Sequence, residues 1–191
     1  MIPEKKSDQK FSYADYLTWP DDERWELING EAWSMSPAPA SRHQRITGEI
    51  FGQIWQQLKG KPCRVFPAPF DVRLVKEKQQ EEQDIHNTLQ PDISVICDLS
   101  KIDERGCSGA PDLVVEVLSA STGYKDQTAK LSLYEEYWVK EYWIVNPERE
   151  TVQVFLHNGI DYDKPQYYKK NELIISSAPQ GLTLVLQEVF E

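Results

Sequence analysis

Two acidic residues stand in short apolar segments, where a carboxylate needs a partner. Asp92 opens the segment Asp92 to Cys97 (DISVIC), and Glu116 lies within Asp112 to Leu118 (DLVVEVL). Burying a lone ionised carboxylate is costly, so each acid calls for a cation, a hydrogen-bond donor or a position at the rim of a sheet. If the two segments are paired strands, the carboxylates lie close together and a cation keeps both ionised. Mg²⁺ prefers hard oxygen ligands of this kind.

Each acid also has a structural interpretation. Asp92 follows Pro91, and a Pro-Asp pair often begins a strand or turn, with the carboxylate capping local backbone. Glu116 could instead form a buried salt bridge with an arginine or a lysine. We favour the metal site for both residues, and more firmly for Glu116, because residues two apart in a strand share a face and its neighbours are nearly all apolar.

A basic residue follows the second acidic segment at helical spacing. Asp126, Lys130, Tyr134 and Tyr137 fall on one stripe of a helix. If Lys130 points back at the sheet, its ammonium group could steady an attacking water or stabilise charge that develops on phosphorus. A surface ion pair between Asp126 and Lys130 explains the same spacing and would contribute about 0.2–0.5 kcal/mol. Spacing alone leaves these two interpretations open.

A histidine lies at the start of the longest amphipathic segment. From Ser41 to about Leu58, apolar residues recur every three or four positions, which predicts a helix. His43 shares the stripe of Ile46 and Ile50 and therefore faces inward. We expect either a core histidine with satisfied hydrogen bonds or a side chain that lines the acidic site.

The elements that must position these residues follow from periodicity and turn signals. Asn29-Gly30 between two short apolar runs predicts a β-hairpin from Trp25 to Met35. The remaining expected elements are a short helix Tyr13 to Leu17 capped by Ser12, an edge strand within Cys63 to Val75, a helix Lys125 to Trp138, a strand Glu141 to Val145 and its hairpin partner Thr151 to Leu156. This order predicts an α/β sandwich: a mixed central β-sheet flanked by helices, with β-hairpins added at the N- and C-terminal ends.

Composition limits the class of protein. A chain of 191 residues with 40% hydrophobic residues predicts a single domain over residues 1–191, with residues 1–11 as a flexible leader. The net charge of −10 argues against indiscriminate coating of nucleic acid. The first residues lack the apolar run of a signal peptide, and no segment reads as a membrane span, so we expect a cytoplasmic protein. Cys63, Cys97 and Cys107 show no zinc-ligand spacing, and we expect them to be reduced.

Several motifs together resemble one family. The run PDLVVEVLS (Pro111 to Ser119), followed by Asp126, Lys130, Tyr134 and EYWIVNP (Glu141 to Pro147), resembles the Uma-type family of restriction endonucleases within the PD-(D/E)XK nuclease superfamily. The upstream motifs fit the same family in the same order: WELINGE (Trp25 to Glu31), MSPAPASRHQ (Met35 to Gln44) and QPDISVI (Gln90 to Ile96). The combination covers most of the chain.

The resemblance implies a restriction-endonuclease-like core and roles for individual residues. Asp92 matches the PD aspartate and Glu116 the acidic residue of the (D/E)XK element, both as metal ligands. The lysine two positions after that acid is absent, because position 118 is Leu, and Lys130 matches the helix lysine that replaces it. Glu26 matches an N-terminal glutamate that completes the acidic site, and the family also places a histidine at the position of His43.

These expectations give a leading function and two alternatives. The resemblance implies Mg²⁺-dependent hydrolysis of nucleic acid phosphodiesters, with DNA as the substrate, Mn²⁺ as a substitute metal and a homodimer that cuts two strands. The first alternative is a binding module on a nuclease fold without catalysis, which the negative charge and the displaced lysine favour. The second is metal-assisted hydrolysis of a small phosphorylated substrate, because a fold does not fix a function.

Overall fold

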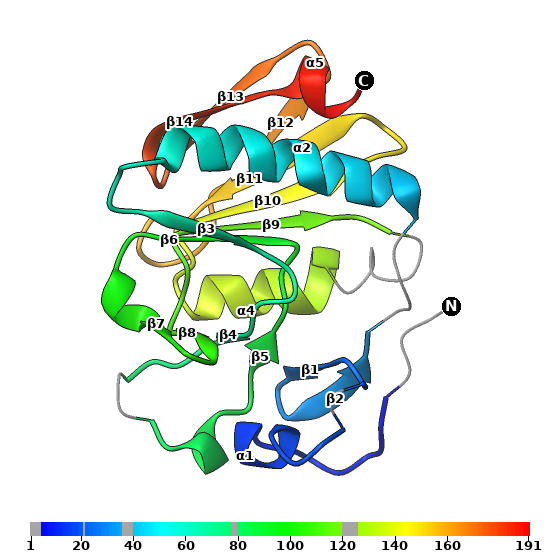
Figure 1. Ribbon diagram of the computed structural model, residues 1–191, viewed down its shortest axis with the longest axis vertical. Helices are drawn as coiled ribbons and strands as arrows, with labels where there is room; N and C mark the ends of the chain where they lie inside the picture. The colour runs from blue at the N-terminus through cyan, green and yellow to red at the C-terminus, as the bar shows by residue number, and fades with distance from the viewer. Residues whose placement is uncertain (1–4, 21, 36–39, 78–79, 120–125) are drawn as a thin grey trace.

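The fold is built from two six-stranded sheets and a two-stranded sheet within residues 5–20, 22–35, 40–77, 80–119 and 126–191, which the computed structural model describes (Figure 1). The helical elements are α1 (Tyr13–Tyr16), α2 (Ser41–Leu58), η1 (Glu82–Asp84), η2 (Leu99–Lys101), η3 (Asp126–Lys130), α4 (Leu131–Glu136) and α5 (Leu186–Val189). The strands are β1 (Trp25–Ile28), β2 (Glu31–Ser34), β3 (Arg64–Pro67), β4 (Val72–Arg73), β5 (Thr88–Leu89), β6 (Ile93–Ile96), β7 (Ile102–Asp103), β8 (Gly106–Ser108), β9 (Leu113–Val117), β10 (Glu141–Asn146), β11 (Thr151–Leu156), β12 (Gln166–Lys169), β13 (Leu173–Ser177) and β14 (Gln180–Val185).

The central sheet is mixed, as the sequence predicts. Its strand order is β12-β11-β10-β9-β6-β3, and β9 pairs with β10 in parallel while the other neighbours are antiparallel. A parallel pair needs a crossover connection, which here runs through η3 and α4. The proline-containing strand β3 lies at the sheet edge, where a missing backbone N–H is tolerated.

The two faces of the central sheet are covered by different layers, which Figure 1 shows above and below β9 and β10. Leu113, Val115 and Val117 of β9 pack in the cluster that contains the apolar stripe of α2, together with residues of β13, β14 and α5. Val114 of β9 packs in a second cluster with α4 and the sheet β2-β1-β5-β4-β8-β7. The alternation expected for this strand is confirmed, and it directs Glu116 toward α4.

The N-terminal elements follow their local turn chemistry. Asn29 and Gly30 have φ values of 51° and 75°, the left-handed pair of a tight hairpin turn, and β1 and β2 pair around them. The Ser12 side chain accepts from the backbone N–H of Asp15, and the Asp15 side chain accepts from the backbone N–H of Ser12. This reciprocal capping box fixes the start of α1, as predicted.

Two sequence expectations differ from the structure. Cys63 and Cys97 form a disulfide, because they lie directly opposite each other where the β3–β6 register continues beyond Arg64↔Ile96. The expectation of reduced thiols was therefore wrong for this pair. It holds for Cys107, which is a free cysteine. The second helix is shorter than predicted: α4 ends at Glu136, and Lys125 lies outside the described residues. Among the described helices, none has the length and apolar character that a membrane span requires.

Candidate active site

A buried lysine joins two glutamates that are 90 positions apart in the chain, at the centre of the predicted acidic site. Lys130 Nζ lies 2.9 Å from Glu26 Oε1 and 2.8 Å from Glu116 Oε1. The side chains of Lys130, Glu26 and Glu116 are 3%, 2% and 5% exposed. Removing one member of such a buried pair leaves an uncompensated charge, which costs about 3–5 kcal/mol. The three residues therefore depend on one another for their charged states.

Three elements from different parts of the fold deliver these side chains. Glu116 comes from β9 of the central sheet, and Glu26 comes from β1 of the N-terminal hairpin. Lys130 is the last residue of η3, a π-helical turn, and turns of this kind often occur at functional sites. The interpretation of Lys130 as half of a surface ion pair is wrong, since its side chain is buried between the two glutamates.

A tyrosine that the sequence analysis placed on the stripe of Lys130 also reaches the site. Tyr134 OH donates to Glu116 Oε1 at 3.1 Å. Burial raises the pKa of the Tyr134 phenol well above its usual value, and the neighbouring Glu116 carboxylate raises it further. Tyr134 is therefore a fixed neutral donor. The i, i+4 spacing from Lys130 was the signal for its position, although no role was assigned to it.

Asp92 lies beside Glu116 at the rim of the sheet. The β6–β9 register pairs Ile93 with Val115, so one further step brings Asp92 opposite Glu116. Asp92 Oδ2 accepts from the backbone N–H of Val117 at 2.8 Å. Asp92 has a side chain 20% exposed, against 5% for Glu116, so this carboxylate faces the outside of the site.

His43 approaches Asp92 from the opposite face of the sheet. His43 Nε2 is 3.3 Å from Asp92 Oδ2, and Nδ1 is 3.4 Å from Thr47 Oγ1. The histidine faces inward from the first turn of α2, as its place on the apolar stripe predicts. Both expectations for His43 are thus compatible: it is buried with polar partners, and it contacts a predicted site residue.

Gln90, which the sequence analysis did not single out, links the cluster to its surroundings. Its backbone N–H donates to Glu26 Oε1 at 3.3 Å, and its side-chain Nε2 donates to Asp71 Oδ1 at 2.9 Å. Its side-chain Oε1 accepts from Arg24. Burial raises the pKa of the Asp71 carboxyl, which accepts from Gln90 in this network. A lone polar residue before a strand carries no pattern that would reveal such a role.

The donor set fits a divalent cation that retains water. Among the described residues, no three histidine, cysteine or acidic side chains are arranged to hold a metal together. Asp92 and Glu116 offer two hard carboxylates at the ends of adjacent strands. Mg²⁺ is typically bound by one or two carboxylates, with the other positions left to water and substrate phosphate. The two residues therefore suit Mg²⁺ better than a metal that needs a complete protein cage.

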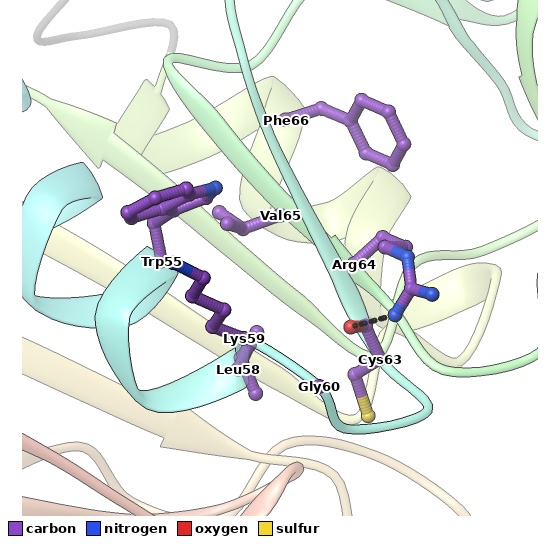
Figure 2. Close-up of a pocket in the computed structure, with 8 residues that line it drawn as sticks. All are labelled: Trp55, Leu58, Lys59, Gly60, Cys63, Arg64, Val65 and Phe66. Carbon is purple, nitrogen blue, oxygen red and sulfur yellow. Dashed lines mark hydrogen bonds between the residues drawn. The ribbon is translucent and has the colours of Figure 1, made fainter.

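A surface hollow lies away from these residues, at the edge of the sheet. It has a volume of about 250 Å³ and is lined by the end of α2 and by β3, including Trp55, Cys63 and Phe66 (Figure 2). None of the predicted site residues lines it. The acidic cluster is recognised from its buried charges.

Comparisons with known proteins identify the family and the fold of the chain. An uncharacterised protein of Synechocystis sp. is 26% identical over 157 residues, which cover 81% of this chain and 77% of that protein. The crystal structure of an Anabaena variabilis protein, described as a "putative nuclease belonging to DUF820", superposes on this chain with a TM-score of 0.74 at 21% sequence identity. The match covers 94% of this chain and 97% of the other chain, so the two proteins share a fold. The Uma2 family, described as "Putative restriction endonuclease", matches residues 13–187. The chain therefore belongs to the Uma2 family of restriction-endonuclease-like proteins.

Proposed function

We propose that this protein is a Mg²⁺-dependent endonuclease that hydrolyses phosphodiester bonds of DNA. The observation that carries the proposal is the meeting of Asp92 and Glu116 at adjacent strand ends, with Lys130 held at Glu116 inside the core. Buried, interacting charges of this kind are common at functional sites. The family and the fold support the same class of reaction.

Asp92 and Glu116 would hold the metal in this mechanism. A bound Mg²⁺ supplies Lewis-acid polarisation of a phosphoryl oxygen and lowers the pKa of a coordinated water. Asp92 is the more exposed of the two carboxylates and lies where a substrate phosphate can arrive. Glu116 lies deeper, and its Oε1 accepts from both Lys130 and Tyr134, which fixes the direction of its carboxylate.

Lys130 would act on the reacting phosphate or on the water that attacks it. Its ammonium group offsets negative charge that develops on phosphorus, which is the role of a preorganised cation in phosphoryl transfer. Glu26 holds the ammonium group in place through a 2.9 Å contact. His43 orients Asp92 through their 3.3 Å contact. In this scheme Glu26 and His43 are positioning residues.

Double-strand cleavage would require two such sites. One acidic cluster with one lysine serves one phosphodiester at a time, so we propose that two copies of the chain pair, as the sequence analysis expected. Mn²⁺, another hard divalent ion, would substitute for Mg²⁺ at the two carboxylates.

A second candidate function is a binding module on the nuclease fold that lacks catalysis. Two observations favour it: the net charge of −10, and the burial of Lys130, whose side chain is only 3% exposed between two glutamates. A lysine that only neutralises a core would explain the same contacts. This alternative predicts binding without cleavage.

Plasmid cleavage separates the two functions. Wild type and the double variant Asp92→Asn/Glu116→Gln would be incubated with supercoiled and single-stranded circular DNA, in Mg²⁺, Mn²⁺ or EDTA. The proposal expects nicking by the wild type only, and only with metal. No nicking by either protein in any condition would favour the binding module, and equal nicking by both proteins would place the chemistry elsewhere.

A further inference from the structure

Arg24 is an exposed residue that shares a hydrogen-bonding partner with the acidic cluster. It immediately precedes β1, two positions before Glu26. Arg24 Nε and Nη2 donate to Gln90 Oε1 at 3.1 and 2.6 Å. The backbone N–H of the same glutamine donates to Glu26 Oε1 at 3.3 Å. Gln90 therefore holds the Arg24 guanidinium at the rim of the site while also contacting the buried Glu26.

The hydrogen-bonding partner of Arg24 is neutral, although the charge of Arg24 also acts on the nearby Asp71 carboxyl, where it lowers the pKa that burial raises. Arg42, Arg73 and Arg105 each form ion pairs with a carboxylate. Arg24 forms no ion pair with any residue in the described ranges. A guanidinium has five N–H donors, and Gln90 accepts from only two of its three nitrogens.

The acceptor that holds Arg24 is itself fixed. Gln90 is 8% exposed, and its Nε2 donates to Asp71 Oδ1 at 2.9 Å and to Tyr16 OH at 3.2 Å. These two bonds determine which way the amide points, so its oxygen must face Arg24. A guanidinium held in advance loses less conformational freedom when it binds a ligand, and its planar fork matches the oxygens of a phosphate.

A chain with a net charge of −10 needs local positive charge where a polyanion is to approach its acidic site. We propose that Arg24 binds a backbone phosphate of the nucleic acid substrate beside the acidic cluster, as a substrate-binding residue. This inference rests on the proposed function for the identity of the polyanion. It assigns to Arg24 affinity for the backbone, not for base sequence, because phosphate contacts carry no sequence information directly.

Binding measured in the absence of catalysis tests the assignment. Labelled duplex and single-stranded DNA would be titrated with protein in EDTA, at several salt concentrations, with fluorescence anisotropy as the readout. Arg24→Gln removes the charge and keeps an amide donor for Gln90. We expect its Kd to rise about five- to tenfold, and the slope of log Kd against log salt concentration to fall by about one, as for the loss of one phosphate contact.

Arg64→Gln is the matched control. Arg64 is also exposed, and its Nη1 donates only to neutral backbone carbonyls, among them that of Cys63 (Figure 2). It pairs with Ile96, at the end of the β3–β6 ladder away from Asp92. The control should bind DNA with the affinity and salt slope of the wild type.

Turnover adds a second readout. If Arg24 contacts a phosphate equally before and during reaction, Arg24→Gln raises KM about five- to tenfold and leaves kcat within about twofold. An unchanged Kd, salt slope and KM in Arg24→Gln would overturn the assignment while leaving the endonuclease intact. If the wild type never cleaves DNA but Arg24→Gln binds DNA more weakly than the wild type does, the proposed function is overturned and the phosphate contact is retained. If the wild type binds neither duplex nor single-stranded DNA, both the proposed function and the phosphate contact are overturned.

Discussion

Two buried glutamates lie on adjacent strands of the central sheet, and their partners differ in kind. Glu141 on β10 is fully buried, and neutral donors surround it: Trp143 Nε1 at 2.7 Å on Oε1, and the Ser176 hydroxyl with the backbone N–H groups of Ser177 and Ala178 at 2.8–2.9 Å on Oε2. Glu116 on β9 instead contacts a buried ammonium group that a second glutamate shares. Burial alone therefore does not distinguish Glu116 from Glu141.

The difference lies in what each carboxylate holds. The donors to Glu141 come from its own strand and from the end of β13, so this residue ties the C-terminal hairpin to the sheet. Glu116 holds Lys130 and Tyr134 next to a partly exposed aspartate. We therefore assign a packing role to Glu141 and propose a chemical role for Glu116.

The largest expected effect is on catalysis by Glu116→Gln. The amide keeps the shape of the side chain and an oxygen for Tyr134, but it removes one of the two carboxylates that we propose as metal ligands. We expect the cleavage rate to fall about a thousandfold or more, equivalent to about 4 kcal/mol of transition-state stabilisation. Single-turnover cleavage of plasmid DNA measures this. A fall of less than tenfold would show that Glu116, like Glu141, has a packing role and no role in catalysis.

Lys130→Met should lower both activity and stability. It leaves Glu26 and Glu116 buried without their shared cation, and we expect the free energy of unfolding to fall by about 3–5 kcal/mol. Urea denaturation measures the change. Adding Glu26→Gln to Lys130→Met should recover part of the loss, because one buried charge is then removed.

Lys140→Met is the control for the lysine. Lys140 Nζ lies 2.6 Å from Asp112 Oδ1, but its side chain is 66% exposed. Its removal should lower the free energy of unfolding by less than about 1 kcal/mol. If both variants were equally stable, the ion pairs of Lys130 would not sustain the buried cluster.

Glu141→Gln should lower the stability of the fold and leave the cleavage rate unchanged, whereas Glu116→Gln should act mainly on the cleavage rate. An amide cannot accept on both ends, so at least one buried donor among Trp143 and the β13 end loses its partner. We expect the free energy of unfolding to fall by about 2–4 kcal/mol, with the cleavage rate per folded molecule unchanged. Thermal unfolding and cleavage at a temperature well below the transition test the two parts. Lost cleavage in folded protein would contradict the comparison.

Tyr134→Phe is the smallest change. It removes one donor to Glu116 and leaves Lys130 in place. We expect a loss of about 1–1.5 kcal/mol in the free energy of unfolding and a decrease in cleavage rate of less than about tenfold. A fall as large as that of Glu116→Gln would show that Tyr134 touches the reacting groups and does more than position the carboxylate.

Apolar periodicity explains why much of the fold could be predicted. The alternation in β9 determines the faces of the sheet and directs Glu116 toward α4, and the stripe of α2 turns His43 inward. The Asn29-Gly30 turn has one dominant geometry and defined the N-terminal hairpin. Strong local patterns of this kind depend little on the rest of the molecule.

Contacts between distant segments could not be predicted in this way. Cys63 and Cys97 are separated by 34 positions, and their pairing depends on the β3–β6 register. Glu141 meets donors 35–37 positions later in the chain, and Gln90 reaches Arg24 across 66 positions. Glu26 was predicted as a site residue from the family resemblance and not from residue spacing. Its contact with Lys130 is visible only in the folded structure.

Isothermal titration with Mn²⁺ would measure the metal site itself in wild type, Glu116→Gln and Glu141→Gln, each shown to be folded by circular dichroism. We expect wild type and Glu141→Gln to bind the metal with the same Kd, and Glu116→Gln to bind it more weakly by on the order of a hundredfold. Equal Mn²⁺ affinity in all three proteins, or no binding by the wild type, would contradict a metal site at Asp92 and Glu116.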